Sequence, residues 1–542
     1  MRDMTEQEEL QMLRELVKKQ QEELEKKDQI IEKQRIQIDN MVQALLHARK
    51  KLYGPSSEAT GQCSGQMSLF ESMPELAKEL LGEQKKITVR PYKRTARQPG
   101  IREEMLQGLP REVEEYIINP EDTCTECGGE LKVIGREIVR TEVEYQPAKL
   151  IVKQIIRQVA KCTQCGKGDS PRDKEHFQKA AVPHAVLSHS LATPSLAAQV
   201  MYQKFMMGVP FNRQEKDWYR LGLVLPRSNM ANWTIRCSEE WLKPVYDRIH
   251  QIQMECRYLH MDETRIQCNK EAGKKASSES FIWVIRSGGS EEFQSVYFYY
   301  SQTRNGDIAR SLLEGFHGYL TTDAYAGYEK VEGIIRNLCW AHVRRYMIDS
   351  IPLDNNGKEL KGSKGAEGRE YINLLFRLEE EMAGMSAEER QEKRQTASRM
   401  LLDVFWTWVE KTSQMHTTNE KLTEALNYAS NQKKYLETFL EDGNLPISNN
   451  LCEASIRPFA TGRRAWLFAD TPKGAQANAI LYTMVENARI NELDAYEYLK
   501  YLLSEMPNID FHNHPDLIDR YLPWSKELPD QCRLKRKHTK LL

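Results

Sequence analysis

One apolar stripe near the start of the sequence constrains the fold more than any other feature. Residues 1–53 contain no proline or glycine, and an apolar side chain recurs at every seventh position, at Leu10, Val17, Leu24, Ile31, Ile38 and Leu45. A helix with this period gathers its apolar residues on one narrow face, which a second helix covers. We therefore predict a coiled-coil oligomerisation helix over residues 1–53 and a homo-oligomer, most simply a dimer. The alternative is a helix that packs on its own chain.

The charged residues are balanced overall but unevenly distributed. The chain has 77 basic and 78 acidic residues among 542, and this net charge of −1 argues against a general nucleic-acid binder. However, residues 85–111 carry a net charge of +6, residues 149–179 carry +5, and five basic residues without any acid follow from Arg533. Such stretches attract phosphates, although solvated linkers have them too. We predict a basic linker over residues 54–115 and a C-terminal basic tail over 501–542.

The sequence contains neither a membrane span nor an export signal. No apolar run approaches the roughly 20 residues that cross a bilayer, and no apolar stretch follows a basic start. The eleven cysteines are odd in number and unevenly placed. This usage is typical of a reducing compartment and of metal binding rather than of a disulfide framework. We therefore expect a cytoplasmic protein without a membrane partner.

Two cysteine pairs predict a structural zinc site. Each pair has two residues between its cysteines and a glycine directly after the second, and 34 residues separate the pairs. Four thiolates suit tetrahedral zinc and leave no open position for catalysis, while the glycines permit a tight turn. Strands expected over 131–139 and 149–160 complete a zinc ribbon over residues 116–180; a redox-active pair is the competing interpretation. The expected ligands of one structural zinc are Cys124, Cys127, Cys162 and Cys165.

The pattern of residues 190–245 predicts a helix-turn-helix DNA-binding domain. Helices are expected over 196–206 and 212–221, and a third helix follows a turn that ends at Pro226, with Ser228 as its N-cap. This is the spacing of a helix-turn-helix, although other helical hairpins share it. The residues expected to face a DNA groove are Arg227, Ser228, Asn229 and Asn232.

The pattern changes to strands near residue 254. We expect strands over 257–264, 280–287, 294–301 and 319–323, a hairpin turn at 288–290 and a helix over 307–313. This order opens a ribonuclease-H-like fold, in which the first and fourth strands are neighbours. Asp262 and Asp323 then lie side by side, and a third acid from a later helix would complete a cage for two Mg²⁺ ions. Each aspartate taken alone is also an ordinary turn former.

Five segments from residue 261 onward combine acids, amides and arginines. They are Met261-Asp262-Glu263-Thr264, Thr322-Asp323-Ala324-Tyr325, Cys339-Trp340-Ala341-His342-Val343-Arg344-Arg345, residues 445–458 and residues 461–468. These segments resemble the catalytic core of insertion sequence 66 family transposases, which belong to the DDE (Asp-Asp-Glu) group. The resemblance extends over nearly the whole chain, from residues 49–58 through the cysteine pairs to residues 521–524. It implies a bacterial, nucleoid-associated protein.

The resemblance implies a catalytic triad of Asp262, Asp323 and Glu453 that binds two Mg²⁺ or Mn²⁺ ions. Glu263 adjoins the first acid, but alternation along the strand would turn it to the opposite face, where a supporting role is expected. The family often has an aspartate at the position of Ser448, which cannot bind a metal strongly. This departure does not remove the triad.

Basic residues beyond the second and third acids are candidates for binding DNA phosphates, because guanidinium forks match phosphate oxygens. Surface salt bridges are the alternative for each arginine. The family commonly has Arg-Lys where this chain has two arginines after Gly462, which preserves the charge and alters the geometry. Cys339 and His342 make only half of a second metal site, so a phosphate-binding role is preferred for the histidine. The candidates are His342, Arg344, Arg345, Arg457, Arg463 and Arg464.

The 130 positions from Asp323 to Glu453 exceed what one connecting helix requires. Residues 349–444 are polar and helix-rich, which predicts a helical insertion. Its expected helices cover 367–382, 387–411 and 419–440, and Trp406 and Trp408 are expected in its core. The catalytic core would then combine residues 254–348 and 445–500. The predicted fold class is multidomain α+β, with a coiled-coil helix, a zinc ribbon, a helix-turn-helix and a ribonuclease-H-like α/β catalytic domain.

These features predict a transposase that binds the ends of its own insertion sequence and catalyses Mg-dependent DNA strand cleavage and strand transfer. Its partners would be the terminal inverted repeats, target DNA, a second protomer and small accessory proteins of the same element. The runner-up is a zinc-ribbon, helix-turn-helix DNA-binding regulator with an inactive ribonuclease-H-like domain. The two hypotheses differ in whether the three acids converge in the folded chain.

Overall fold

The computed structural model describes residues 6–53, 150–161 and 177–534. The chain divides into two compact units, Met1–Ala77 with Ile155–Leu542, and Lys78–Gln154. The second unit is described only at residues 150–154. No helix among the described residues combines the length and the apolar character needed to cross a membrane.

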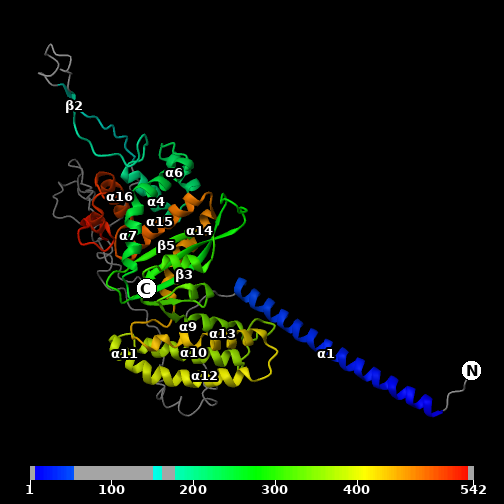
Figure 1. The fold of residues 1–542 in the computed structure, drawn as a ribbon. Coiled ribbons are helices and arrows are strands. Elements are labelled where there is room, and N and C mark those ends of the chain that lie inside the picture. Colours follow the sequence, from blue (N-terminus) through cyan, green and yellow to red (C-terminus); the bar gives the residue numbers. More distant parts are fainter. Residues whose placement is uncertain (1–5, 54–149, 162–176, 535–542) are drawn as a thin grey trace, which may run out of the picture. The chain divides into compact units, whose positions relative to one another are not determined.

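The N-terminal stripe forms one continuous helix, α1 (Glu6–Tyr53) (Figure 1), as the absence of proline and glycine predicts. The stripe residues whose side chains are described remain open to solvent. Leu24, Ile31, Ile38 and Leu45 are 59–71% exposed. Since an apolar stripe of this length is stable in water when a second helix covers it, pairing with another chain stays our prediction.

Two short strands of the predicted zinc ribbon are described, β1 (Val159–Lys161) and β2 (Phe177–Lys179), which pair antiparallel. The strand predicted over 149–160 is too long, because residues 150–158 are not part of a strand. A run of β-branched residues forms a strand only where a partner supplies the ladder, and β2 supplies it from Val159 onward. The four predicted zinc ligands and the strand predicted over 131–139 lie outside the described residues.

Helices follow near their predicted bounds. They are α4 (Pro194–Phe205), α5 (Phe211–Arg220), α6 (Arg227–Cys237), a π-helical turn (Ser238–Leu242) and α7 (Lys243–Gln253). The predicted N-cap is wrong, because α6 begins after Pro226 rather than at Ser228. The Glu215 carboxylate of α5 accepts the Arg227 backbone N–H at 3.0 Å and so satisfies an N–H group that a capping side chain would otherwise bind.

One mixed sheet follows, with the strand order β5-β4-β3-β6-β7. Its strands are β3 (Tyr258–Cys268), β4 (Glu279–Ser287), β5 (Val296–Ser301), β6 (Tyr319–Thr322) and β7 (Ile335–Leu338), and α8 (Gly306–Leu312) connects β5 to β6. The first three strands are antiparallel, whereas β6 and β7 run parallel to β3. The predicted neighbourhood of the first and fourth strands is therefore confirmed.

The connection between β4 and β5 is longer than the predicted turn. It covers residues 288–295 because Gln294 folds back, and its side-chain amide donates to the Gly288 and Glu291 carbonyls, both at 3.0 Å. A short strand, β8 (Phe468–Ala469), adds to β3 far along the sequence.

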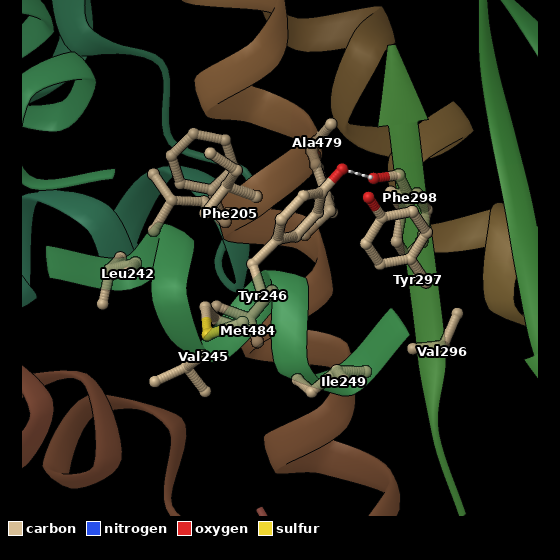
Figure 2. Packing of buried hydrophobic residues seen from close by; sticks show 14 of the residues in the cluster. Phe205, Leu242, Val245, Tyr246, Ile249, Val296, Tyr297, Phe298, Ala479 and Met484 are labelled. Atoms are coloured by element: carbon tan, nitrogen blue, oxygen red, sulfur yellow. Dashed lines mark hydrogen bonds between the residues drawn. The ribbon is translucent and has the colours of Figure 1, made fainter. Parts of the chain in front are cut away.

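The helices before and after the sheet share one hydrophobic core with it. Figure 2 shows Tyr246 of α7 between β5 and α15 (Pro472–Ile490), with its hydroxyl donating to the Phe298 carbonyl at 2.9 Å. Phe205 of α4 and Met484 of α15 belong to the same cluster. Because Tyr246 is buried and hydrogen-bonded, α7 is held against the sheet by packing and by a satisfied polar group.

The named elements between β7 and residue 450 are all helical, as predicted for the insertion, and loops connect them. The helices are α9 (Trp340–Asp349), α10 (Lys364–Glu381), α11 (Ala387–Lys393), a π-helical turn (Arg394–Ser398), α12 (Arg399–Ser413), α13 (Glu420–Leu436) and a 3₁₀ turn (Thr438–Leu440). Trp406 is buried against Trp340, which confirms its predicted core position. Trp408 is half-buried, and its indole N–H donates to Glu367 at 3.0 Å.

The described part of the predicted basic tail is packed rather than free. Helix α16 (Ala495–Glu505) crosses the predicted boundary at residue 500, and a 3₁₀ helix (Pro515–Tyr521) follows. Leu502 and Tyr521 are buried in the common core. The basic residues that suggested a tail begin only at Arg533, whereas the preceding residues carry enough apolar side chains to fold onto α4.

A buried arginine holds the end of the insertion. Arg394 is 1% exposed, pairs with Glu379, and donates to the carbonyls of Phe439, Asp442 and Leu445 at 2.8–2.9 Å. We predict that Arg394→Ala lowers the free energy of unfolding by about 3–5 kcal/mol, because it leaves a buried carboxylate and three carbonyls without their partner. Urea denaturation followed by tryptophan fluorescence measures this loss.

The matched control is Arg399→Ala, whose guanidinium is 42% exposed and lies 3.6 Å from Glu437. Such a pair contributes at most about 1 kcal/mol. Equal losses in the two variants would contradict a special role for Arg394.

Candidate active site

The edge of β3 opposite β4 pairs with two different strands and leaves an opening between them. β6 pairs with residues 258–260, and β8 pairs with Gln267 and Cys268. Residues 261–266 on this edge have no partner among the described strands. Asp262 lies in this opening, half-buried.

Parallel pairing brings the second acid to the first. His260 of β3 lies opposite Thr321 of β6, and two residues further along each strand are Asp262 and Asp323. Asp323 is half-buried and directly follows the end of β6. The predicted side-by-side position of the two aspartates therefore follows from the observed register.

Helix α14 (Asn450–Trp466) brings the third acid in its first turn. The Cys452 thiol donates to the carbonyl of Val284 at 3.5 Å, and Val284 is the residue of β4 that pairs with Asp262. Because Glu453 is next to Cys452, the start of α14 lies over the part of β3 that carries Asp262. The chain thus returns to the first acid after the whole helical insertion.

Asn449, the residue before α14, joins three elements. Its side-chain amide donates to the Met261 carbonyl at 3.1 Å, and its Oδ1 lies 2.9 Å from His260 Nδ1. Its backbone N–H donates to the Cys339 sulfur, just before α9, at 3.1 Å. Asn449 is fully buried, so each of these bonds is made without competition from water.

The acids share one electrostatic environment. Burial raises the pKa of Asp262 to about 8, and the negative charges of Glu263, Asp323 and Glu453 raise it further within that shift. The Glu263 backbone N–H, which donates to Asp262 at 2.8 Å, acts in the opposite direction. The charges of Asp323 and Glu453 thus both act on the Asp262 carboxyl group, as expected for acids that lie near one another.

One of these acids has an oxygen that a cation would satisfy. Glu453 Oε1 is buried and has no hydrogen-bond partner within the described part of the chain, whereas Oε2 lies 3.9 Å from the Arg345 guanidinium. A buried carboxylate oxygen without a partner is unfavourable. Carboxylate oxygens are the ligands that Mg²⁺ and Mn²⁺ prefer, so the donor set fits a divalent cation of this class.

The sequence-based prediction missed a fixed positive charge beside the acids. Arg304, in the loop after β5, forms an ion pair with Glu263 and lies 3.7 Å from Asp323. Its guanidinium also lies over the ring of Tyr325. No periodicity marks Arg304, because a loop rather than a regular element carries it to the acids.

Glu263 lies next to the triad acids and shares the Arg304 guanidinium with Asp323. Its carboxylate accepts a hydrogen bond from Tyr328 at 3.0 Å as well as the ion pair from Arg304. Tyr328 belongs to a short 3₁₀ helix (Ala326–Lys330). The guanidinium nitrogen that pairs with Glu263 also lies 3.7 Å from Asp323, so these contacts do not confirm the opposite face expected from alternation along the strand.

The residues predicted to face a DNA groove lie at the start of α6. All four are exposed to solvent, and Met230 and Trp233 anchor the opposite side of the helix in the core. The four residues are Arg227, Ser228, Asn229 and Asn232.

The predicted phosphate-binding residues have different surroundings on α9 and α14. On α9, Arg345 is exposed beside Glu453, whereas Arg344 is half-buried and donates to Asn373 of the insertion at 2.8 Å. On α14, Arg463 donates to the Arg265 carbonyl. The remaining predicted residues are His342, which is half-buried, and Arg457 and Arg464, which are exposed. The structure therefore brings Arg345 next to the acids and commits Arg344 to the insertion.

Comparison with protein families identifies the chain. Residues 189–477, more than half of the sequence, match the model of the family described as "Transposase IS66 family". This match places the protein among the transposases, the DNA-binding proteins of mobile elements. The chain belongs to the IS66 family.

Two further family models match the N-terminal part. Residues 121–166 match the zinc-finger binding domain of IS66 transposases, and this stretch contains all four predicted ligand cysteines. The match supports a structural zinc ion. Residues 42–113 match a model described as "Transposase C of IS166 homeodomain".

Individual relatives are similar over most of the chain. Uncharacterized protein y4hP of Sinorhizobium fredii is 27% identical over 88% of this chain and 86% of its own length. Uncharacterized protein y4jD of the same organism is 26% identical over 77% of this chain and 81% of its own. Among solved structures, the Drosophila P element transposase strand transfer complex matches at 15% identity over 61% of this chain and 87% of that chain. Its TM-score is 0.22.

The raised pKa of Asp262 makes stability depend on pH. Because the pKa is higher in the folded chain than in an unfolded one, the protonated carboxyl favours folding. This contribution is complete below the unfolded pKa of about 4 and is lost as the pH rises through about 8. We predict that the melting temperature of the protein in Mg²⁺-free buffer falls between pH 5 and pH 8.

Asp262→Asn removes the titrating group and should flatten this profile, as differential scanning calorimetry would measure. Asp470→Asn is the control, because Asp470 is exposed and pairs with Lys270 on the surface. An unchanged profile in Asp262→Asn would show that another group causes the pH dependence.

Proposed function

We propose that this protein is a DDE transposase that cleaves the DNA ends of its own insertion sequence and joins them to target DNA. Asp262, Asp323 and Glu453 are its metal-binding triad. The observation that carries the proposal is the convergence of these acids from two neighbouring strands and a helix that begins 127 residues after Asp323. The charges of Asp323 and Glu453 both act on the Asp262 carboxyl group, as a shared metal site would require.

The strand order supports a ribonuclease-H-like core. Three antiparallel strands are followed by two strands that run parallel to the first, in the order β5-β4-β3-β6-β7. The first two triad residues come from β3 and from the end of β6. The alternative is an inactive DNA-binding regulator. Acids that lie close together repel one another, and a regulator gains nothing from this repulsion, so the convergence favours an enzyme.

The residues around the triad have separable roles. Bound Mg²⁺ or Mn²⁺ ions would activate the attacking water or 3′-hydroxyl and stabilise the departing oxygen. Asp262, Asp323 and Glu453 hold these ions through carboxylate oxygens. Arg345 is 44% exposed beside Glu453, and its guanidinium would contact a DNA phosphate at the same place.

One site can serve both steps of the reaction. In the first step, water attacks the phosphorus at the element end, and the departing oxygen becomes a free 3′-hydroxyl. In the second step, this hydroxyl attacks a phosphorus of target DNA, so one P–O bond forms as another breaks. Both steps make the same demand on the acids, because each combines an activated oxygen nucleophile with a departing oxygen.

Recognition of the element ends is assigned to the N-terminal modules. The exposed start of α6 and the zinc-binding segment would read the terminal inverted repeats, as a helix-turn-helix and a zinc ribbon do. The open apolar stripe of α1 would pair two protomers, each of which holds one end. Small accessory proteins of the same element are further expected partners.

Replacement of any triad residue should abolish chemistry and preserve DNA binding. We predict that Asp262→Asn, Asp323→Asn and Glu453→Gln each lower the cleavage rate by at least about a hundredfold, because a polar amide cannot replace a carboxylate on a divalent cation. Labelled end DNA, Mg²⁺ and purified full-length protein give the rate, and gel-shift titration gives the affinity.

The Glu263→Gln variant distinguishes the triad residues from a neighbouring acid with a supporting role. Glu263 contacts Arg304 and Tyr328 rather than α14, so its replacement should slow cleavage less than any triad change. Cleavage by Asp262→Asn at the rate of the unaltered protein would refute the assignment.

The start of α6 should determine affinity for the element ends. We predict that Arg227→Ala weakens binding of end DNA by about 1–3 kcal/mol if the side chain contacts a base edge. Arg236→Ala is a control on the same helix, because Arg236 lies in its last turn and pairs with Glu240 at 2.9 Å. Equal affinity of both variants for end DNA would contradict the proposed role of α6.

A further inference from the structure

A second group of metal-ligating side chains lies beside the triad. Cys339 is the residue before α9, His342 is in the first turn of that helix, and Glu453 is in the first turn of α14. One ligand atom from each of these three residues lies within 4.8 Å of the other two. The Cys339 and His342 pair, only half of a metal site in the sequence, thus gains a third ligand from a residue 111 positions beyond His342.

The backbone holds this group together. The segment before α14 runs along the start of α9, where the Trp340 N–H donates to the Ile447 carbonyl at 2.9 Å. Two residues later, the Asn449 N–H donates to the Cys339 sulfur at 3.1 Å. Hydrogen bonds donated by backbone N–H groups therefore fix how the starts of the two helices lie next to each other. Their arrangement does not depend on long surface side chains alone.

The three donor types select a particular class of metal. Sulfur, imidazole nitrogen and carboxylate oxygen together suit Zn²⁺ and related transition metals, whereas Mg²⁺ prefers oxygen alone. In tetrahedral zinc sites with bonds of about 2.0–2.3 Å, neighbouring ligand atoms lie roughly 3.5 Å apart. The separation of up to 4.8 Å therefore requires a contraction of about 1 Å, which side-chain rotations can provide.

We propose that Cys339, His342 and Glu453 form an inhibitory site for a transition-metal ion of the Zn²⁺ class, with water as the fourth ligand. The ion would draw Glu453 away from the Mg²⁺ site and thereby stop cleavage. The inhibitory part rests on the proposed function, whereas the binding site itself does not.

Competition follows from charge and from the limited number of ligands. Glu453 is the only residue shared by the two groups, and its buried Oε1 has no other partner within the described part of the chain. Two divalent ions at adjoining sites also repel each other in a partly buried environment. Burial raises the pKa of the Cys339 thiol to about 11, so zinc binding must release a proton, and zinc affinity should rise with pH.

The zinc content of the full-length protein tests the binding site directly. After equilibration with Zn²⁺ and gel filtration, mass spectrometry should find about two zinc ions per chain in the unaltered protein, of which one belongs to the cysteine-rich segment. Cys339→Ser and His342→Ala should each retain about one. Serine preserves an acceptor for the Asn449 N–H, so the first variant is expected to fold.

Cys256→Ser is the matched control. Cys256 is a half-buried free cysteine outside the cluster, and its variant should keep both ions. One zinc ion in the unaltered protein, or two in Cys339→Ser, would overturn the site.

The ratio of cleavage rates in Mg²⁺ with and without added Zn²⁺ tests the inhibition. In the unaltered protein, we expect added Zn²⁺ to lower the cleavage rate at least roughly tenfold, which corresponds to about 1.4 kcal/mol in the activation free energy. In Cys339→Ser, the rate should fall far less. Equal inhibition of both proteins would mean that zinc acts elsewhere and would overturn the inhibitory role. A protein that binds two zinc ions but never cleaves DNA would instead refute the proposed function and leave the zinc site standing.

Discussion

The hydrogen bonds of one buried amide, Asn449, determine where the third acid lies. Its side chain is bound to the Met261 carbonyl and the His260 imidazole of β3, and its backbone N–H is bound to the Cys339 sulfur just before α9. Glu453 follows one helical turn later, and its N–H donates back to the Asn449 carbonyl at 3.1 Å. Because burial lowers the pKa of His260 to about 4, the imidazole is neutral at physiological pH. This connection therefore adds no charge to the carboxylate cluster.

Buried hydrogen bonds also fix the segment in which the chain returns from the helical insertion. A long insertion between the second and third acids is compatible with one site only if the segment after the insertion has a fixed position. Otherwise Glu453 would have no defined position relative to the other two acids. Arg394 binds three carbonyls of the returning segment. Beyond it, the Tyr258 hydroxyl at the start of β3 donates to Asp442 at 2.6 Å. The insertion thus ends on the same strand that carries the first acid.

Sequence patterns predicted the elements with strong local signals. Period-seven apolar residues predicted α1, and alternation with turn residues predicted the strand order that brings Asp262 and Asp323 together. Signals that depend on distant partners were less informative. The N-cap of α6 was misplaced because Glu215 on a different helix binds the Arg227 N–H. Arg304 was missed because a loop carries it, and Asn449 was read only as part of a motif, since nothing local reveals that its amide binds β3.

The pairing of β8 with β3 has a mechanical consequence for α14. The helix is tied to β3 at its beginning by Asn449 and, just beyond its end, by β8, whose Phe468 and Ala469 lie opposite Gln267 and Cys268. Seventeen residues of helix span about 25 Å. The seven residue steps from Met261 to Cys268 span about 23 Å of strand. Two rods of nearly equal length that are joined at both ends cannot slide past each other. Glu453 therefore stays level with Asp262 when a force acts on the exposed side of α14.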